Sequence, residues 1–336
     1  MFEPYPYQQR ILNAVLGGKN VILQIPTAGG KTIGAALPFL QDRANSTGLL
    51  PEKAIYTVPM RVLTTQFKRT CREFREQELH PARFHDLEKQ YQRFDRAIDS
   101  VQTGETPDDP QFESMIVACT IDQLLASALG VPYSLGHNAA NINLGAICGS
   151  YLILDEPHLY PLTNEGRSYK GALTTCLEML RLLNGLTRFV FMSATMSSEL
   201  IERLRVMLDA VVITVDNAEL AQINQGRHRT IERAPVDAEM SAECVLQAHQ
   251  QCSLVVCNTV QQAQEMYLEL HTLLQQRDQA TQLKLLHSRF TDEDRHDQGK
   301  ALSQLLGKEQ WKQGVYQGPN VIVVATQVVE VGLDIS

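Results

Sequence analysis

The segment 26–32, which reads PTAGGKT, has the residue types of a loop that binds phosphate. It follows the apolar run 20–25 and precedes the stretch 33–40, whose residues favour a helix. A strand, a glycine turn and a Lys-Thr pair at a helix start wrap backbone N–H groups around phosphates. Lys31 would then reach the β- and γ-phosphates of a nucleotide, and the Thr32 hydroxyl would bind Mg²⁺. The residues expected to contact the nucleotide here are Thr27, Gly29, Gly30, Lys31 and Thr32.

A second segment, 155–158 (DEPH), places two carboxylates and an imidazole at the end of the apolar run 151–154. Parallel α/β sheets bind their ligands at the carboxyl ends of strands. We expect Asp155 to hold the metal through water and Glu156 to orient or deprotonate the attacking water. Each segment alone also fits a simpler interpretation, either a glycine turn with an exposed lysine or a solvated strand end. Their combination indicates a nucleoside-triphosphate hydrolase or a descendant of one.

The elements that must position these groups alternate between strand-like and helix-like patterns. Apolar runs predict strands at 21–25, 54–58, 115–119, 151–154, 188–192 and 211–215, and later at 254–257, 283–286 and 321–325. Helix-like stretches lie near 33–41, 62–77, 121–129, 170–184 and 197–208, and then near 242–251, 261–276 and 292–306. This alternation predicts the α/β class with doubly wound parallel sheets.

The chain of 336 residues is longer than one ordinary hydrophobic core, which favours two domains. Regular apolar periodicity fades after residue 215 and resumes near 242. We therefore expect a first domain at 1–215, a linker at 216–241 and a second domain at 242–336. Residues 86–112 are polar and are expected to form a surface insertion, and 130–149 are expected to be rich in loops.

The composition, 44% apolar and 20% charged residues, is that of a soluble globular protein. No apolar run approaches the roughly 20 residues that span a bilayer, and the amino terminus has no signal-peptide pattern. The seven cysteines contain no Cys-x-x-Cys pair, so we expect reduced thiols, no structural zinc and a cytoplasmic location.

The formal net charge of −8 argues mildly against a nucleic-acid partner bound on a broad basic face. It is compatible with a narrow groove, in which Thr, Gln, backbone N–H groups and a few Arg side chains contact phosphates.

Two further pairs of residues have the chemistry to join a nucleotide site. Gln8, next to Tyr7 just ahead of the first predicted helix, can contact an adenine edge through its amide. Ser193 and Thr195 follow an apolar strand and offer two hydroxyls near the carboxylates, although they could instead cap the next helix. Two phosphate-loop-like lobes with a triphosphate between them suggest a motor protein.

With these motifs the chain resembles superfamily-two helicases of the DEAD/DEAH-like kind. The narrower resemblance is to the helicase core of the CRISPR-associated helicase–nuclease of type I systems. The sequence motifs that support this narrower resemblance are 120–123 (TIDQ), 286–290 (LHSRF) and 327–335 (QVVEVGLDI). The resemblance implies two tandem RecA-like lobes, the second incomplete. It also implies ATP hydrolysis with Mg²⁺ that drives 3′ to 5′ movement along single-stranded DNA, recruited by a CRISPR effector complex.

The resemblance also implies roles for individual residues. Gln8 would read adenine and Asp334 would meet the ribose from the second lobe. The catalytic group would be Lys31, Asp155, Glu156 and His158, with Thr32 and Asp155 at the metal. His158, Ser193 and Thr195 would couple hydrolysis to strand movement. The residues implied to line the path of the nucleic acid are Pro59, Arg61, Thr120, Asn258, Thr259, Arg289 and Thr326.

The chain departs from the family pattern at several positions. Ile25 and Ala28 stand where glycines are usual, and Pro157 removes one backbone donor between the carboxylates and His158. No arginine-rich final motif occurs before Ser336. We therefore expect a piece of a longer protein that is weakly active or inactive by itself.

A metal-dependent nuclease is not expected in this chain. The two His-Asp pairs, at 85–86 and 296–297, lie in polar helix-like stretches without neighbouring ligands, so a nuclease domain would lie elsewhere or be absent. Two alternatives to the CRISPR interpretation stay open: a superfamily-two translocase of DNA repair or restriction, and an ATP-binding scaffold that does not hydrolyse.

Overall fold

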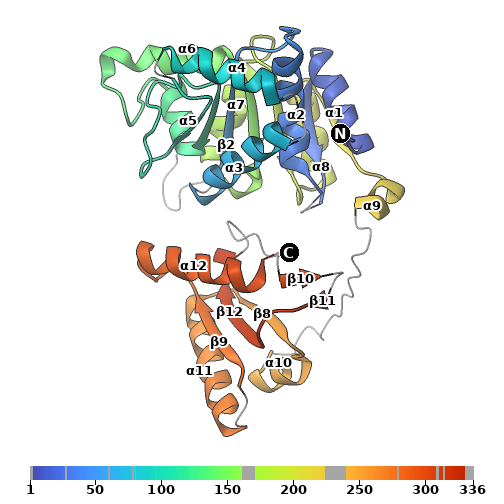
Figure 1. Cartoon of the computed structure of the whole chain (residues 1–336), viewed down its shortest axis with the longest axis vertical. Coiled ribbons are helices and arrows are strands. Elements are labelled where there is room, and N and C mark those ends of the chain that lie inside the picture. The colour runs from blue at the N-terminus through green and yellow to red at the C-terminus, as the bar shows by residue number, and fades with distance from the viewer. Residues whose placement is uncertain are drawn as a thin grey trace. The chain divides into compact units, whose positions relative to one another are not determined.

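A computed structural model describes two compact units, Met1–Ile223 and Asn224–Ser336 (Figure 1). The described residues are 3–26, 29–59, 61–77, 79, 81–94, 96–160, 171–223, 240–277, 280–307, 310–312 and 315–329. We expected residues 216–241 to form a linker. Within this segment, helix α9 (Asn217–Ile223) belongs to the first unit.

The first unit is built on a seven-stranded sheet with the strand order β3-β4-β2-β5-β6-β1-β7. The strands are β1 (Asn20–Gln24), β2 (Lys53–Val58), β3 (Asp99–Gln102), β4 (Ile116–Thr120), β5 (Ser150–Asp155), β6 (Phe189–Ser193) and β7 (Ala210–Thr214). Every neighbouring pair in this sheet is parallel. All seven strands therefore end at the same edge, and the prediction of a parallel α/β fold is confirmed.

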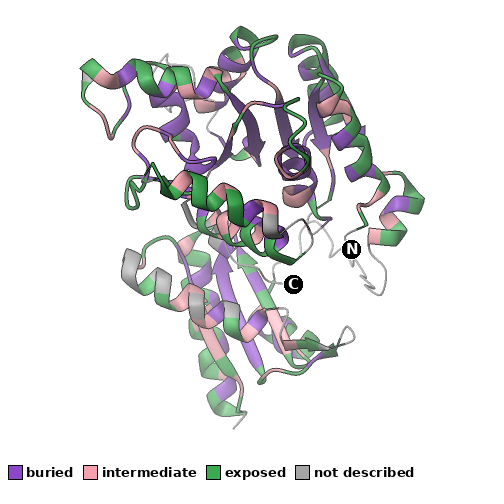
Figure 2. Ribbon diagram, turned by 45° about the horizontal axis from the view of Figure 1, so that its top comes forward, coloured by how far each residue is buried: buried purple, intermediate pink, exposed green. Residues whose placement is uncertain are grey.

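Helices cover the sheet, and their outer surfaces are exposed while the inner strands are buried (Figure 2). They are α1 (Pro6–Leu16), α2 (Lys31–Asn45), α3 (Arg61–Gln77), α4 (Pro81–Gln92), α5 (Ile121–Ala128), α6 (Ala140–Cys148), α7 (Ala172–Leu182) and α8 (Ser198–Met207). Two short 3₁₀ turns, η1 (His137–Ala139) and η2 (Pro157–Leu159), complete the unit.

Successive side chains of β5 enter two different cores, one on each face of the sheet. Tyr151 and Ile153 belong to the core shared with α1, α2 and α3, whereas Leu152 and Leu154 belong to the core shared with α5, α7 and α8. Burial on both faces explains why this strand reads as a continuous apolar run. Each such side chain stabilises the fold by roughly 1.5–3 kcal/mol. Asp155 is therefore held at the end of a rigid, wholly buried strand.

Two segments contain more regular structure than their sequence indicates. The expected surface insertion 86–112 includes the end of α4 and strand β3, and the expected loop-rich segment 130–149 includes α6. In β3 the polar side chains are buried with partners. Ser100 Oγ donates to Asp109 Oδ2 at 2.9 Å, and Gln102 Nε2 donates to Ser134 Oγ at 2.8 Å. Because tertiary partners satisfy these groups, a polar segment can form a strand there.

The second unit has a smaller parallel sheet with the order β8-β12-β9. Its elements are α10 (Ala242–Ala248), β8 (Cys252–Cys257), α11 (Val260–Gln276), β9 (Gln282–Leu286), α12 (Asp292–Leu306), β12 (Val321–Thr326) and η4 (Gln327–Val329). A short antiparallel pair, β10 (Trp311–Lys312) and β11 (Val315–Tyr316), precedes β12. The central strand β12 is buried along its whole length and joins cores on both faces of the sheet.

Within the described part of the chain, no helix combines the length and the apolar composition that are needed to cross a membrane. The seven cysteines are all free thiols.

Candidate functional site

The predicted phosphate loop leads from the end of β1 into α2. Gly30 stands just before the helix with φ of 83°, a left-handed backbone conformation that glycine adopts without strain. A Cβ on Gly29 would lie 2.8 Å from Ile25 Cγ2 and 3.1 Å from the Pro26 carbonyl oxygen, so this turn leaves no room for a side chain. Helix α2 begins at Lys31, and its first N–H groups provide an anion site at this edge of the sheet. Thr27 and Ala28 lie outside the described residues.

Lys31 and Glu156, which the sequence predicts as phosphate and water ligands, form an ion pair. Lys31 Nζ donates to Glu156 Oε1, and the two side chains are 9% and 19% exposed. Glu156 is also one of few non-glycine residues with positive φ, at 48°. This conformation costs on the order of 1–3 kcal/mol and, when it occurs, is often at a functional site. Strand β5 thus turns sharply at its end and presents Glu156 to the phosphate loop.

Asp155 is more deeply buried and has a different set of contacts. Its Oδ2 accepts a hydrogen bond from the Tyr56 hydroxyl, while its Oδ1 is buried without a hydrogen-bond partner among the described residues. The pKa of Asp155 is raised to about 6, mainly by burial and also by the neighbouring Glu156 charge, against the opposing effects of Tyr56 and Lys31. A buried carboxylate oxygen without a partner suits a hydrated metal ion that brings its own positive charge.

Thr32 lies beside these groups, because its side chain opposes the rise in the pKa of Tyr56 that burial causes. Thr32 and Asp155 therefore fit the oxygen ligands that Mg²⁺ takes, with water and nucleotide phosphates supplying the rest. No cluster of three or more His, Cys, Asp or Glu side chains that could hold a metal alone occurs among the described residues.

His158 connects Glu156 to the neighbouring strand β6. Its Nδ1 lies 3.2 Å from Glu156 Oε2 and 2.8 Å from Ser193 Oγ. Thr195 takes part only through its backbone, since its N–H donates to Ser193 Oγ at 3.3 Å and its side chain is exposed. The alternative role of Ser193 and Thr195 as helix caps is wrong, because Ser197 caps α8 by accepting a bond from Leu200 N–H at 3.3 Å.

Gln8 lies in the first turn of α1 rather than ahead of that helix, and so does Tyr7. The Gln8 side chain is buried, and both ends of its amide contact the protein. Its Oε1 accepts from Tyr5 N–H at 3.0 Å, and its Nε2 donates to the Gly30 carbonyl at 3.1 Å. Tyr7 donates to the Gly29 carbonyl at 2.5 Å. Helix α1 therefore supports the phosphate loop, and contact of Gln8 with adenine would need one of these bonds to be exchanged.

The residues predicted to line a nucleic-acid path in the first unit follow adjacent strands. Pro59 comes after β2 and Thr120 ends β4, and the two strands pair with Val58 opposite Thr120. Thr120 precedes α5 without making a side-chain capping bond. Arg61 is the first residue of α3, and its side chain lies outside the described part.

In the second unit the corresponding residues also gather at the carboxyl edge of a sheet. Asn258 follows β8, and its Oδ1 accepts from Gln327 Nε2, which follows β12, at 3.3 Å. Thr326 ends β12 and is buried, while the Thr259 hydroxyl caps α11 by accepting from Gln262 N–H at 3.2 Å. Arg289 follows β9 and is exposed. Asp334, the predicted ribose ligand, lies outside the described residues.

Two functional candidates, Tyr56 and Tyr160, were missed by reasoning from the sequence. The Tyr56 hydroxyl contacts Asp155, and the buried Tyr160 hydroxyl lies 3.4 Å from the carbonyl oxygens of Thr57 and Asp155. For Tyr56 the available signal was a tyrosine inside a largely buried strand, because a buried hydroxyl needs a hydrogen-bond partner.

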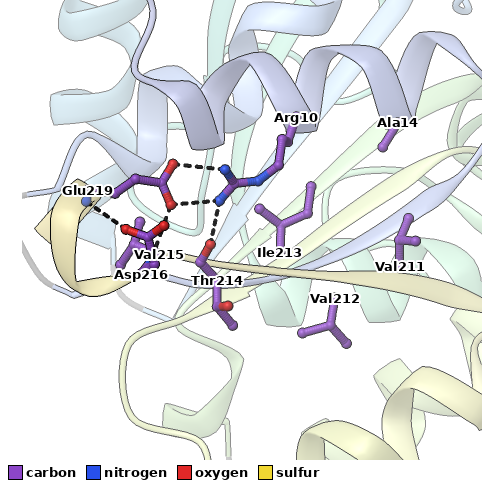
Figure 3. A pocket seen from close by; sticks show the side chains of 9 residues that line it. All are labelled: Arg10, Ala14, Val211, Val212, Ile213, Thr214, Val215, Asp216 and Glu219. Atoms are coloured by element: carbon purple, nitrogen blue, oxygen red, sulfur yellow. Dashed lines mark hydrogen bonds and ion pairs between the residues drawn. The ribbon is translucent and has the colours of Figure 1, made fainter.

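A pocket of about 500 Å³ lies between α1 and β7, and its described lining contains none of the predicted site residues (Figure 3). Its charged groups satisfy one another. Arg10 donates to both carboxylate oxygens of Glu219, at 2.8 and 2.9 Å, and to the Thr214 carbonyl at 2.6 Å. The Arg10 hydrogen bond lowers the pKa of Glu219. This pairing ties α1 to the end of the sheet and to α9.

Two family models match the chain. The model described as DEAD/DEAH box helicase matches residues 5–204. The model described as the C-terminal part of the CRISPR-associated nuclease/helicase Cas3 matches residues 249–336.

Among curated proteins, one named as a CRISPR-associated nuclease/helicase Cas3 from Methanocaldococcus jannaschii is 25% identical, covering 100% of this chain and 43% of its own length. An ATP-dependent DNA helicase Hel308 from Methanocella arvoryzae is 28% identical over 58% of this chain and 22% of its own length. The chain therefore spans less than half the length of these relatives.

Solved structures share the fold. The T. fusca Cas3–ADP structure matches with a TM-score of 0.68 at 19% identity, over 100% of this chain and 42% of that one. The Mycobacterium smegmatis helicase Lhr bound to ssDNA and AMP-PNP matches with a TM-score of 0.58 at 16% identity, over 99% and 41%. These matches confirm the predicted fold class of two RecA-like sheets.

Proposed function

Because the chain belongs to the DEAD/DEAH box helicase family, we propose that it hydrolyses ATP to move along single-stranded DNA as the helicase core of a CRISPR interference enzyme. The match of residues 249–336 to the Cas3 C-terminal model supports the CRISPR role over a repair or restriction role. The proposed partners are single-stranded DNA and a CRISPR effector complex in the cytoplasm, with the nuclease on another domain or polypeptide.

One observation carries the proposal for ATP hydrolysis. Lys31 from the phosphate loop and Glu156 from the end of β5 form an ion pair, and His158 and Ser193 continue the same chain of contacts. A phosphate-binding cation and a carboxylate able to accept a proton from water are thus within one side-chain contact of each other. Phosphoryl transfer to water uses a cation at the phosphates and a group that accepts a proton from the attacking water, and this pair supports both roles.

In the proposed reaction, the phosphates of ATP bind over the loop 26–32 and draw Lys31 away from Glu156. Glu156 then accepts a proton from the attacking water. Bound Mg²⁺, held by Thr32 and Asp155, would neutralise charge on the phosphate oxygens. His158 contacts both Glu156 and Ser193. It would therefore transmit a change in the position or charge of the Glu156 carboxylate to the end of β6.

The DNA part of the proposal is supported by polar residues at the carboxyl edges of both sheets. Thr120 in the first unit, and Asn258 and Arg289 in the second, each follow or end a strand of their own sheet. Hydroxyl, amide and guanidinium groups at such edges can hold DNA phosphates without reading sequence.

The test is ATP hydrolysis by this chain with and without single-stranded DNA, with Glu156→Gln as the matched inactive control. We expect weak turnover by this chain that rises with DNA and is lost in the variant. Nucleotide binding without turnover, both in this chain and in the longer protein that contains it, would favour the scaffold alternative, and absence of nucleotide binding would reject the proposal. The CRISPR role is tested in the host cell, where Lys31→Ala in the protein that contains this chain should abolish interference against a targeted plasmid.

A further inference from the structure

Tyr56 occupies a fixed position between the two residues that fit Mg²⁺. It lies in β2, which pairs with β5 so that Tyr56 is opposite Ile153, two residues before Asp155. Only 3% of Tyr56 is exposed. Its ring stacks on Phe67 of α3, with 3.5 Å between ring centroids and 2° between ring planes. The strand and the stacked ring together leave the Tyr56 hydroxyl little freedom.

This single hydroxyl lies near side chains from two other elements. It donates a hydrogen bond to Asp155 Oδ2 at the end of β5, and the Thr32 side chain at the start of α2 is close enough to oppose the rise in the pKa of Tyr56. Since the one Tyr56 proton is given to Asp155, Thr32 can bond to Tyr56 only by donating its own proton to a Tyr56 lone pair.

The direction of these bonds matters for a cation. A Thr32 proton donated to Tyr56 would leave the Thr32 lone pairs available. The Tyr56 proton points to Oδ2 of Asp155, which leaves Oδ1 available, and that atom is buried without a partner among the described residues. The Tyr56 proton is thus directed away from the Asp155 oxygen that a metal ion or its water would use.

We propose that Tyr56 is a positioning residue of the metal site, whose hydroxyl holds the Asp155 carboxylate and the Thr32 side chain ready for the Mg²⁺ that accompanies the nucleotide. The proposal rests on the proposed function, because it concerns the metal of that same site. Partners that orient metal ligands in this way typically change metal affinity by about 10- to 100-fold when removed.

A second buried tyrosine serves as a control that distinguishes a role of the Tyr56 hydroxyl at the metal site from a purely structural role. Tyr151 also lies in the sheet, is fully buried and donates its hydroxyl proton to the Ala35 carbonyl at 2.8 Å. That bond involves no residue of the proposed metal site. Tyr56→Phe and Tyr151→Phe each remove one buried, hydrogen-bonded hydroxyl and keep the ring.

The experiment measures binding of fluorescently labelled ADP to the whole chain while Mg²⁺ is titrated, and again in EDTA. For Tyr56→Phe we expect the Mg²⁺ concentration at half-maximal binding to rise by about 10-fold or more, with the affinity in EDTA within about twofold of wild type. Tyr151→Phe should match wild type in both measurements. An unchanged or lowered Mg²⁺ requirement in Tyr56→Phe would overturn the proposal.

A second measurement tests whether Tyr56 acts through Asp155. In an Asp155→Ala background, Tyr56→Phe should shift the Mg²⁺ requirement by much less than it does in wild type, whereas equal shifts would contradict the proposal. If Tyr56→Phe does not fold, Phe67→Leu keeps the hydroxyl but removes the ring that holds it, and should raise the Mg²⁺ requirement in the same direction. Failure of wild type to bind ADP at all would instead reject the proposed function.

Discussion

Lys31 and Glu156 lie 125 positions apart in the chain, and their side chains form an ion pair at the carboxyl edge of the first sheet. The lysine predicted to bind phosphate is therefore held by the carboxylate predicted to activate water. A bound nucleotide must compete with Glu156 for Lys31. Removing Lys31 should therefore weaken nucleotide binding, whereas removing the Glu156 charge should leave it unchanged or strengthen it.

The first prediction concerns this competition. Lys31→Ala should abolish detectable nucleotide binding and turnover, because the phosphates lose their main side-chain cation. Glu156→Gln should abolish turnover but bind ATP about as tightly as wild type or more tightly, since it removes the carboxylate that competes with the phosphates for Lys31. Labelled-ATP binding and phosphate release measure the two quantities. Equal loss of affinity in both variants would contradict the assigned roles.

The second prediction concerns the glycine before α2. Gly30→Ala should destabilise the first unit by about 1–2 kcal/mol, because alanine is strained at positive φ, and should weaken nucleotide binding more than 10-fold by distorting the loop. Gly48 is a matched control, since its φ is 65° and nothing lies within 4 Å of a Cβ placed there. Gly48→Ala should carry a similar loss of stability in thermal melts with unchanged nucleotide binding. A loss of binding in both variants would mean that the effect is not local to the loop.

The third prediction is a pH dependence set by Asp155, whose pKa is raised by burial from 3.8 to about 6. Between these values the folded state keeps a proton that the unfolded state has lost, so stability falls as pH rises. Above pH 6 the full cost, on the order of 3 kcal/mol, is present. Without metal, Asp155→Asn should therefore be more stable than wild type at pH 7.5, and the difference should vanish toward pH 4.

Denaturation of the chain in EDTA at several pH values measures this effect. Asp99→Asn serves as a control of opposite sign, because Asp99 forms a buried ion pair with Arg75, at 2.6 Å between Arg75 Nη1 and Asp99 Oδ1. Breaking that pair should destabilise the fold by about 3–5 kcal/mol at pH 7.5. If Asp155→Asn were destabilising at every pH, the buried carboxylate would be stabilised by contacts that the structure does not contain.

The fourth prediction concerns DNA. Arg289→Ala should weaken binding to single-stranded DNA of any sequence and reduce the salt dependence of binding by about 0.7 in the log–log slope, as expected for one lost phosphate contact. Arg61→Ala should behave in the same way. Arg203 is the control, because it is exposed on α8 and paired with Glu199 at 2.7 Å. Fluorescence anisotropy at several salt concentrations measures all three, and an equal effect of Arg203→Ala would reject a specific path.

The class of fold and the motifs of the nucleotide site can be predicted from the amino-acid sequence alone. Strands such as β5, in which all six residues are buried, read as apolar runs because both of their faces are covered. The turn before α2 is visible as two glycines because its backbone conformation and close contacts exclude other residues. The carboxylates at 155 and 156 were found because ligands of a parallel sheet gather where its strands end.

The partner of each of these groups, in contrast, depends on how the chain folds in three dimensions. The sheet order β2-β5-β6-β1 differs from the order along the chain, and it brings Tyr56, Asp155, Ser193 and Lys31 to neighbouring strand ends. Two carboxylates that are adjacent in sequence therefore have different partners. Asp155 is buried and accepts a hydrogen bond from a tyrosine of β2, whereas Glu156 forms an ion pair with a lysine of α2. The apolar periodicity of the sequence predicts which residues are buried. It does not predict their hydrogen-bond partners, because these come from segments that are distant in the sequence.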